Sequence, residues 1–382
     1  RMAELIPDAQ GSRVDPICLD LDSDADPRDD DGRPPLPARP DAGRRRPPSR
    51  SSAPDVRDRF VPFRLYATPG DLREATRGRP PFCHTLREIV GVEGPDADKL
   101  GGMRWIVVAN YLIDFGYLLD EIPELVGLAR AVVFYGCPTD AAGPSRWKAA
   151  CGPALDVRRL APSDPPGSAC NPLPHKIEYG VHHTKMFLVG YETRLRVVIH
   201  TSNLTRADVS NNCQGAYVQD FPLKEVFRSP ACAAGSQSRR TADHCASDDV
   251  YAASSPFEED LVSYLETYHH SQKYVWPLDD APAAPTPLDL VQVLRRHDYA
   301  SAHAVLVPSV PGYHRLPRCP CGHLRLRDVI RRHAPPASGP RRPDALLCQF
   351  SSLGAFGPRW LHELVASLDP DAPRASDQSA AP

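Results

Sequence analysis

The stretch that decides the fold is His182-His183-Thr184-Lys185-Met186-Phe187-Leu188-Val189. We predict a β-strand here, because its second half is an unbroken run of strand-forming residues. A polar turn at 190–194 then leads into a second predicted strand, Leu195-Arg196-Val197-Val198-Ile199. If the two strands pair as a hairpin, the far end of the second returns beside the start of the first.

The two ends of this hairpin carry three polar residues. Alternate residues of a strand share a face, so the imidazole of His183 and the ammonium of Lys185 should point to the same side. Asn203 follows the second strand, eighteen positions after Lys185. Such a trio suits attack on a phosphorus centre: the imidazole is a nucleophile, and the cation and the amide stabilise charge on the phosphoryl oxygens.

The rest of the chain alternates predicted strands and helices. This alternation predicts an α/β fold, a sheet flanked by helices, rather than a helical bundle. We read 138–174, 228–255 and 275–287 as surface insertions, because Pro, Ala, Ser and Gly dominate them. Predicted helices are 86–92, 118–128, 257–268, 288–296 and 323–333, and further predicted strands are 104–109, 131–135, 303–307 and 345–350.

Composition limits the class of protein. The chain has 382 residues, of which 41% are apolar and 24% charged, enough for a sizeable core. Eleven cysteines follow no regular framework, and no secretory segment precedes them, which favours reduced thiols. No run is long enough for a transmembrane helix, so no membrane partner is expected. Cys319-Pro320-Cys321-Gly322-His323 lacks a second ligand pair, and no metal is expected there.

Both ends of the chain differ in composition from the middle. Residues 1–56 are acidic and then rich in Pro and Arg, and we predict that they are disordered. Within them, Ile17-Cys18-Leu19-Asp20-Leu21-Asp22-Ser23-Asp24 resembles a SUMO-interacting motif, which would add a strand to a partner's sheet. An ordinary acidic tail is the simpler interpretation. The ordered domain is predicted at 57–369 and a second polar tail at 370–382.

The hairpin and its Thr-Ser-Asn end at 201–203 resemble the first active-site motif of tyrosyl-DNA phosphodiesterases, a branch of the phospholipase D superfamily. The superfamily motif is His-x-Lys-x4-Asp, but Gly190 occupies the Asp position, as in that branch. The resemblance covers about Phe60 to Leu368 and implies a fold of two similar halves, of which this chain is the first. Other similar segments, in family order, are Asn110–Asp114, Phe257–Leu265, Gly322–Leu326 and Gln349–Gly354.

The resemblance implies an activity. His183 would attack the 3′-phosphodiester between DNA and a tyrosine and form a phosphohistidine, with Lys185 and Asn203 stabilising the phosphoryl oxygens and no metal or cofactor needed. It implies a nuclear DNA-repair enzyme whose partners are single- or double-stranded DNA 3′ ends bearing peptide from topoisomerase I, or other 3′ adducts. A histidine with a purely structural role is the alternative for His183.

Further DNA-binding residues are predicted from the same resemblance. Tyr179, four residues before His183, would stack on a base, although a tyrosine that caps the core is the alternative. A Ser/Gly-rich loop would offer backbone N–H groups and hydroxyls to a phosphate. Its residues are Ser351, Ser352, Leu353, Gly354 and Ala355, of which Ser352 is the strongest candidate.

One difference between this sequence and the family pattern is as important as the match. No second His-x-Lys follows Lys185 in the 382 residues, whereas the family supplies a His-Lys-Asn set from each half. The chain also begins with Arg1 rather than Met, so a fragment is expected, with little turnover alone. A non-catalytic DNA-end binding or regulatory protein, and a dimer in which each chain gives one set, remain alternatives.

Overall fold

The computed structural model describes residues 62–68, 82–171, 173, 175–178, 180–228, 255–268, 275–276, 288–312, 321–333, 347–348 and 357–369. The chain divides into Arg1–Asp55, which lies outside the described residues, and Val56–Pro382. The segment Ile17–Asp24 therefore cannot be placed in the fold. None of the described helices is long and apolar enough to cross a membrane.

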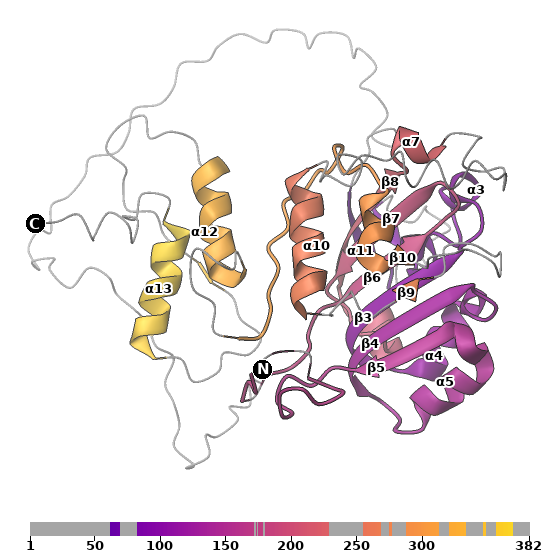
Figure 1. Ribbon diagram of the computed structural model, residues 1–382, viewed down its shortest axis with the longest axis horizontal. Helices are drawn as coiled ribbons and strands as arrows, with labels where there is room; N and C mark the ends of the chain where they lie inside the picture. Colours follow the sequence, from indigo (N-terminus) through magenta and orange to yellow (C-terminus); the bar gives the residue numbers. More distant parts are fainter. Residues whose placement is uncertain are drawn as a thin grey trace, which may run out of the picture. The chain divides into compact units, whose positions relative to one another are not determined.

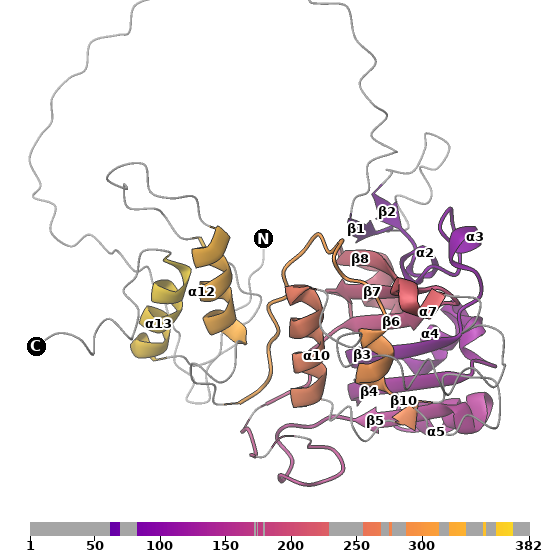
Figure 2. The same ribbon diagram turned by 45° about the horizontal axis from the view of Figure 1, so that its top comes forward.

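A mixed eight-stranded sheet forms the centre of the second unit, which confirms the predicted α/β class. The strands lie in the order β2-β1-β8-β7-β6-β3-β4-β5, which Figure 2 shows from one edge to the other. β3, β4 and β5 are neighbours and run parallel to one another. The pairs β1–β8, β8–β7, β7–β6 and β6–β3 are antiparallel. The strands are β1 Phe63–Tyr66, β2 Cys83–His84, β3 Trp105–Ile113, β4 Arg130–Pro138, β5 Leu155–Arg159, β6 Met186–Gly190, β7 Arg194–His200 and β8 Gly215–Pro222.

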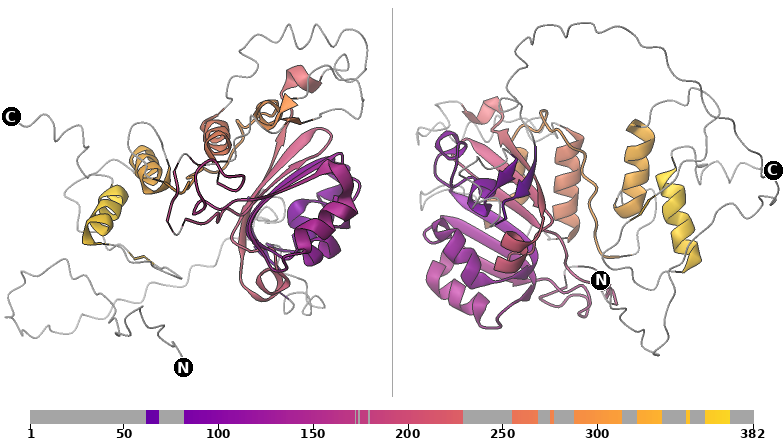
Figure 3. Two further views of the ribbon diagram at one scale, coloured as in Figure 1. Left: turned by 60° about the horizontal axis from the view of Figure 1, so that its bottom comes forward. Right: turned by 180° about the vertical axis from the view of Figure 1, so that it is seen from behind.

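Helices cover both faces of the sheet (Figures 1 and 3). One core packs the sheet against α2, α4 and α5, and the other packs it against α10 and α11. The first half of β3 is apolar on both faces, because Ile106 and Val108 enter the first core, while Trp105 and Val107 enter the second. The helices are α2 Leu86–Val90, α3 Ala97–Leu100, α4 Phe115–Glu121, α5 Gly143–Cys151, α6 Arg206–Asn211, α7 Glu225–Arg228, α10 Pro256–Tyr268, α11 Leu290–Arg295, α12 Gly322–His333 and α13 Pro358–Leu368.

The predicted hairpin is confirmed. β6 and β7 pair antiparallel from Met186 opposite Ile199 to Gly190 opposite Leu195. The turn between them closes with a hydrogen bond from Tyr191 N to Arg194 O of 2.9 Å. The prediction was wrong about where the first strand begins, because β6 starts at Met186, and His183 and Lys185 precede it outside any strand. The carbonyl of Lys185 still pairs across the hairpin, accepting from His200 N at 3.0 Å.

Several other predicted elements need correction. The predicted insertion 138–174 contains α5 and β5. The predicted helix 118–128 is instead α4, which begins at Phe115 and ends before Pro123, because proline lacks the N–H that a helix needs. The predicted strand 303–307 is irregular chain: at its start the Gln219 amide accepts from His303 N at 3.0 Å, and the same amide donates to Ser301 O, just before the segment, at 2.6 Å.

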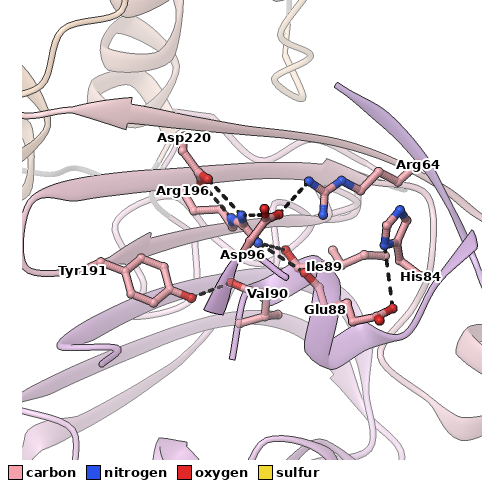
Figure 4. Close-up of polar contacts among 9 residues, drawn as sticks. All are labelled: Arg64, His84, Glu88, Ile89, Val90, Asp96, Tyr191, Arg196 and Asp220. Carbon is pink, nitrogen blue, oxygen red and sulfur yellow. Dashed lines mark hydrogen bonds and ion pairs between the residues drawn. The ribbon is translucent and has the colours of Figure 1, made fainter. Parts of the chain in front are cut away.

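A fully buried arginine fastens α2 to the sheet (Figure 4). Arg196 of β7 makes a bidentate pair with Asp220 of β8 at 2.7 and 2.9 Å, and it also reaches Asp96 at 3.1 Å. Its remaining N–H groups donate to the carbonyls of Glu88 and Ile89 near the end of α2. The last carbonyls of a helix need donors from outside its own hydrogen-bond pattern, and Arg196 supplies such donors here.

A small strand pair and a pair of helices lie outside the eight-stranded sheet. β9 (Val275–Trp276) and β10 (Leu288–Asp289) form a separate antiparallel pair. α12 contacts α10 through a hydrogen-bonded ion pair between Arg325 and Asp260 at 2.5 Å, and His323 of α12 bonds Ser367 of α13 at 2.9 Å.

Candidate active site

His183 and Lys185 lie together, as their spacing predicted. Lys185 Nζ is 3.3 Å from His183 Nδ1 and donates to the backbone carbonyl of His183 at 3.2 Å. An ammonium can only donate, so Nδ1 accepts and the ring proton of this arrangement sits on Nε2. His183 is exposed, whereas Lys185 is buried. The imidazole therefore faces solvent with its charged neighbour held beneath it.

The surroundings of His183 and Lys185 favour a neutral imidazole. Although His183 is exposed overall, neighbouring protein atoms desolvate part of its ring, which lowers its pKa, and the nearby charge of Lys185 lowers the pKa further, so the imidazole is neutral at neutral pH. Burial also lowers the pKa of Lys185, and the carboxylate of Asp208 opposes that shift. A neutral nucleophile thus lies beside a cation.

The neighbouring histidines are held neutral in the same way. Burial, and then the charge of Lys185, lower the pKa of His182 to about 3 and that of His200 to about 3. The ring of His200 stacks on Phe187 with centroids 4.9 Å apart, and its Nδ1 lies 3.1 Å from the hydroxyl of Tyr66. Their neutral rings add no positive charge to the site.

Asn203 is held by a different set of contacts. Its Nδ2 donates to Asp208 Oδ2 at 2.7 Å, and in the described part of the chain it makes no hydrogen bond to His183 or Lys185. The prediction that it returns beside them is therefore supported by backbone pairing and by Asp208, whose charge acts on Lys185, rather than by direct contact.

The turn that carries Asn203 is anchored to the end of β3. Asn110, fully buried, donates to the carbonyl of Ser202 at 3.1 Å. Leu204 bridges to Ile113, and its carbonyl accepts from Asp114 N at 2.9 Å. These contacts explain why strand pairing in the hairpin stops at its open end: the chain after β7 leaves its partner and binds β3 instead.

The segment before β6 is packed from both sides. The ring of Tyr111 lies against that of His183, with centroids 5.1 Å apart. On the other side, the hydroxyl of Tyr264 in α10 lies 2.5 Å from Thr184 Oγ1. Gly136 of β4 lets the segment approach, since a Cβ there would lie 2.7 Å from the Tyr111 ring and 3.1 Å from His182 O.

A cavity of about 700 Å³ opens beside the pair. Thr184, Tyr264 and the segment 304–311 line it together with His183 and Lys185, and most of its wall is apolar. Among the described residues, no group of three metal-ligating side chains is present. The site can therefore accept an anionic group at Lys185 and an apolar group in the adjoining cavity.

The other predicted site residues lie outside the part of the chain that the structure describes. Tyr179 and the loop residues Ser351, Ser352, Leu353, Gly354 and Ala355 lie outside the described residues. Sequence reasoning did not identify Asp208, although Thr205-Arg206-Ala207-Asp208 has the pattern of a helix start, which places Asp208 in the turn after Asn203. It also did not assign a role to Tyr264, for which periodicity gives only a core position.

The family comparisons agree with the motif. The family model described as tyrosyl-DNA phosphodiesterase matches residues 70–381. Tyrosyl-DNA phosphodiesterase 1 of Arabidopsis thaliana is 29% identical over 269 residues, 69% of this chain and 36% of that protein. Tyrosyl-DNA phosphodiesterase 1 of Drosophila melanogaster is 25% identical over 342 residues, 82% of this chain and 46% of that protein.

Among solved structures, the yeast tyrosyl-DNA phosphodiesterase covers 71% of this chain and 49% of its own, with 12% identity and a TM-score of 0.43. The chain thus spans between about a third and a half of the length of these relatives. Because the family model covers well over half of its residues, the chain belongs to the tyrosyl-DNA phosphodiesterase family.

Proposed function

We propose that this chain provides one half of a phosphodiesterase active site that removes tyrosine-linked peptide, and other adducts, from DNA 3′ ends. The observation that carries the proposal is the contact between Lys185 Nζ and His183 Nδ1 at 3.3 Å on the rim of an open cavity. Family membership gives the class of bond that is cleaved.

The proposed chemistry starts from the neutral imidazole. A phosphate oxygen of the substrate attracts the Lys185 ammonium, which leaves the imidazole lone pair free to attack. An N–P bond forms to His183 while the P–O bond to the tyrosine oxygen breaks, and the departing phenolate takes up a proton. Water then attacks the phosphohistidine, the N–P bond breaks, and a DNA 3′-phosphate is released. The amide of Asn203 donates to the phosphoryl oxygens throughout.

The proposal includes an incomplete site. The described residues supply one histidine to the phosphorus centre, and the sequence contains one His-x-Lys. A second acid and base are needed to protonate the phenolate and to activate water. We infer that the isolated 382-residue chain reaches the phosphohistidine more readily than it turns over, and that a second His-Lys-Asn set completes the reaction.

The biological setting is also a proposal. A 3′ end of single- or double-stranded DNA bearing a topoisomerase I peptide matches the proposed chemistry, and such DNA repair would place the protein in the nucleus. Tyr179 and the loop 351–355 are proposed DNA contacts, and the segment Ile17–Asp24 is a proposed SUMO-binding strand. No cofactor is proposed, since Lys185 and Asn203 provide the charge stabilisation.

The test uses a 3′-phosphotyrosyl oligonucleotide with radioactive phosphate at the 3′ position. Wild-type chain should acquire alkali-stable, acid-labile label, and His183→Ala should not. His200→Asn is the matched control, because it removes a histidine that has no proposed bond to phosphorus; it should retain labelling. Absence of label in the wild type, with the chain folded, would overturn the proposal.

A second candidate is a non-catalytic DNA-end binding or regulatory protein. The occupied imidazole lone pair favours it, since Lys185 holds His183 Nδ1 in the free chain. Binding of the oligonucleotide with no label on His183 would identify this function, and equal binding by His183→Ala would support it. A dimer with one set per chain would instead lose activity faster than linearly when His183→Ala chains are mixed with wild type.

A further inference from the structure

Asp208 sits between two carboxamides in the first turn of α6. Its Oδ2 accepts from Asn203 Nδ2 at 2.7 Å, and its Oδ1 accepts from Asn212 Nδ2 at 2.8 Å. The backbone N–H of Asp208 donates to Thr205 Oγ1, the N-cap of the helix, at 3.2 Å. The carboxylate is therefore held by two carboxamides, one on each oxygen, while the N-cap holds the backbone of the same residue.

This contact decides which way the Asn203 amide points. A carboxylate only accepts, so it binds the NH₂ end of the carboxamide and rejects the carbonyl end. Asn203 Oδ1 is buried and has no hydrogen-bond partner in the described structure, yet a flip would place that oxygen against the carboxylate. The amide is held in one orientation, with a second N–H of Nδ2 still available.

Asp208 also acts on the charge of Lys185. The charged or titratable groups that interact with Lys185 are His182 and His183 on its own segment, His200 on β7 and Asp208 on α6. The three histidines are neutral because burial and Lys185 itself lower their pKa values. Asp208 is the one of these groups whose charge raises the pKa of Lys185, against the effect of burial.

We propose that Asp208 is the positioning residue of this site: its carboxylate holds the Asn203 amide as a donor, and its negative charge acts on the Lys185 ammonium. It does so without touching the substrate. The role of the pair toward a phosphate rests on the proposed function, whereas the contacts of Asp208 do not.

Two measurements distinguish the role of Asp208 from the proposed function of the site. The chain has six lysines, so the side-chain ¹³Cε and ¹⁵Nζ resonances can be assigned with Lys185→Arg and titrated individually. In Asp208→Asn the pKa of Lys185 should shift to lower pH, and Asp140→Asn, the same substitution at an exposed aspartate, should leave it unchanged. An unshifted Lys185 titration in Asp208→Asn would overturn the proposal even if the labelling experiment succeeds.

The second measurement is the rate of His183 labelling in a single turnover. Asp208→Asn should slow it by about 10- to 100-fold, because a charged hydrogen bond is lost and the amide is free to flip. Asp208→Glu keeps the charge but moves the acceptor, so it should preserve the Lys185 titration and still slow labelling. An unchanged labelling rate in both variants contradicts the positioning role.

The wild-type chain tests the same contact if the variants fail to fold. The Asn203 Nδ2 proton that bonds Asp208 should exchange slowly with solvent, because this hydrogen bond holds the amide in one orientation. Fast exchange of both Nδ2 protons would overturn the proposal. If the wild type forms no phosphohistidine, the proposed function fails, but the Lys185 and Asn203 measurements still decide the role of Asp208.

Discussion

The hydroxyl of Tyr264 lies 2.5 Å from Thr184 Oγ1, so a bond from the buried face of α10 holds the residue between His183 and Lys185. The helix thereby controls the segment that precedes β6, where strand pairing has already ended. A segment that is not hydrogen-bonded into the sheet as a strand needs such side-chain contacts to keep one conformation.

Replacing Tyr264 by Phe should loosen the site more than the fold. The substitution keeps the ring in the core and removes one hydrogen bond, which should cost about 1 kcal/mol of unfolding free energy. The rate of His183 labelling should fall as well, since Thr184 is released. Urea unfolding and single-turnover labelling measure the two effects.

The matched control is Tyr217→Phe. Tyr217 lines the same cavity, and its hydroxyl donates to Gln219 at 2.5 Å, away from the His-x-Lys segment. A similar loss of stability with unchanged labelling is expected. Equal labelling rates in both variants would show that the Thr184 contact has no role in the site.

The buried Arg196 should contribute strongly to stability. Arg196→Met removes a fully buried charge and leaves Asp220 without its partner, while Asp96 keeps its ion pair with Arg64; breaking a buried pair costs about 3–5 kcal/mol. The lower end of that range is expected, because the two carboxylates retain some exposure to water. Arg359→Met breaks an exposed ion pair with Glu363 and should change urea unfolding little. Equal effects of the two substitutions would contradict this account.

Gly91 should be intolerant of alanine for two reasons. Its φ of +99° is in the left-handed region, which costs an L-residue roughly 1–2 kcal/mol. A Cβ there would also lie 2.6 Å from Arg196 Nη1 and 2.7 Å from the Tyr191 hydroxyl, and such crowding typically costs about 1–3 kcal/mol more.

Gly127 allows the cost of the left-handed backbone conformation to be measured apart from the cost of crowding. Its φ is +91° but a Cβ would meet nothing within 4 Å, so Gly127→Ala measures the backbone term alone. Thermal and urea unfolding should show Gly91→Ala as the more destabilised variant. If the two are alike, the close packing around Arg196 does not contribute.

Acid should destabilise the fold well above the pH at which carboxylates titrate. Burial lowers the pKa of His182 and His200 to about 3 and that of His297 to about 4, whereas the unfolded chain keeps ordinary values near 6.5. The unfolded state therefore binds more protons below about pH 6.5. As the pH is lowered, the free energy of unfolding decreases by up to about 1.4 kcal/mol per pH unit for each histidine.

Urea titrations between about pH 7 and about pH 5 measure this slope. His297→Gln should reduce it, because His297 lies in the core beside α11 and its ring bonds Val293 O at 3.1 Å, away from the proposed site. A free energy of unfolding that is constant over this range would show that the buried histidines do not remain neutral in the folded state.

The sequence allowed the hairpin to be predicted because local pattern and turn chemistry determine it. The apolar run after Lys185, the polar turn and the second run produce strands with the predicted pairing. Contacts between distant residues were not predictable in this way. The end of α4 before Pro123 was not predicted although the proline is visible in the sequence, because apolar periodicity continues past it.

What the sequence alone determined was the residue set of the candidate site, a His-x-Lys pair and a downstream Asn, together with the family to which the chain belongs. Tertiary structure decided how those groups are held. Asp208 orients Asn203, Tyr264 holds Thr184, and β3 binds the turn after β7. Residue type and spacing along a strand are local properties, whereas each of these contacts depends on which surfaces meet when the sheet and its helices pack.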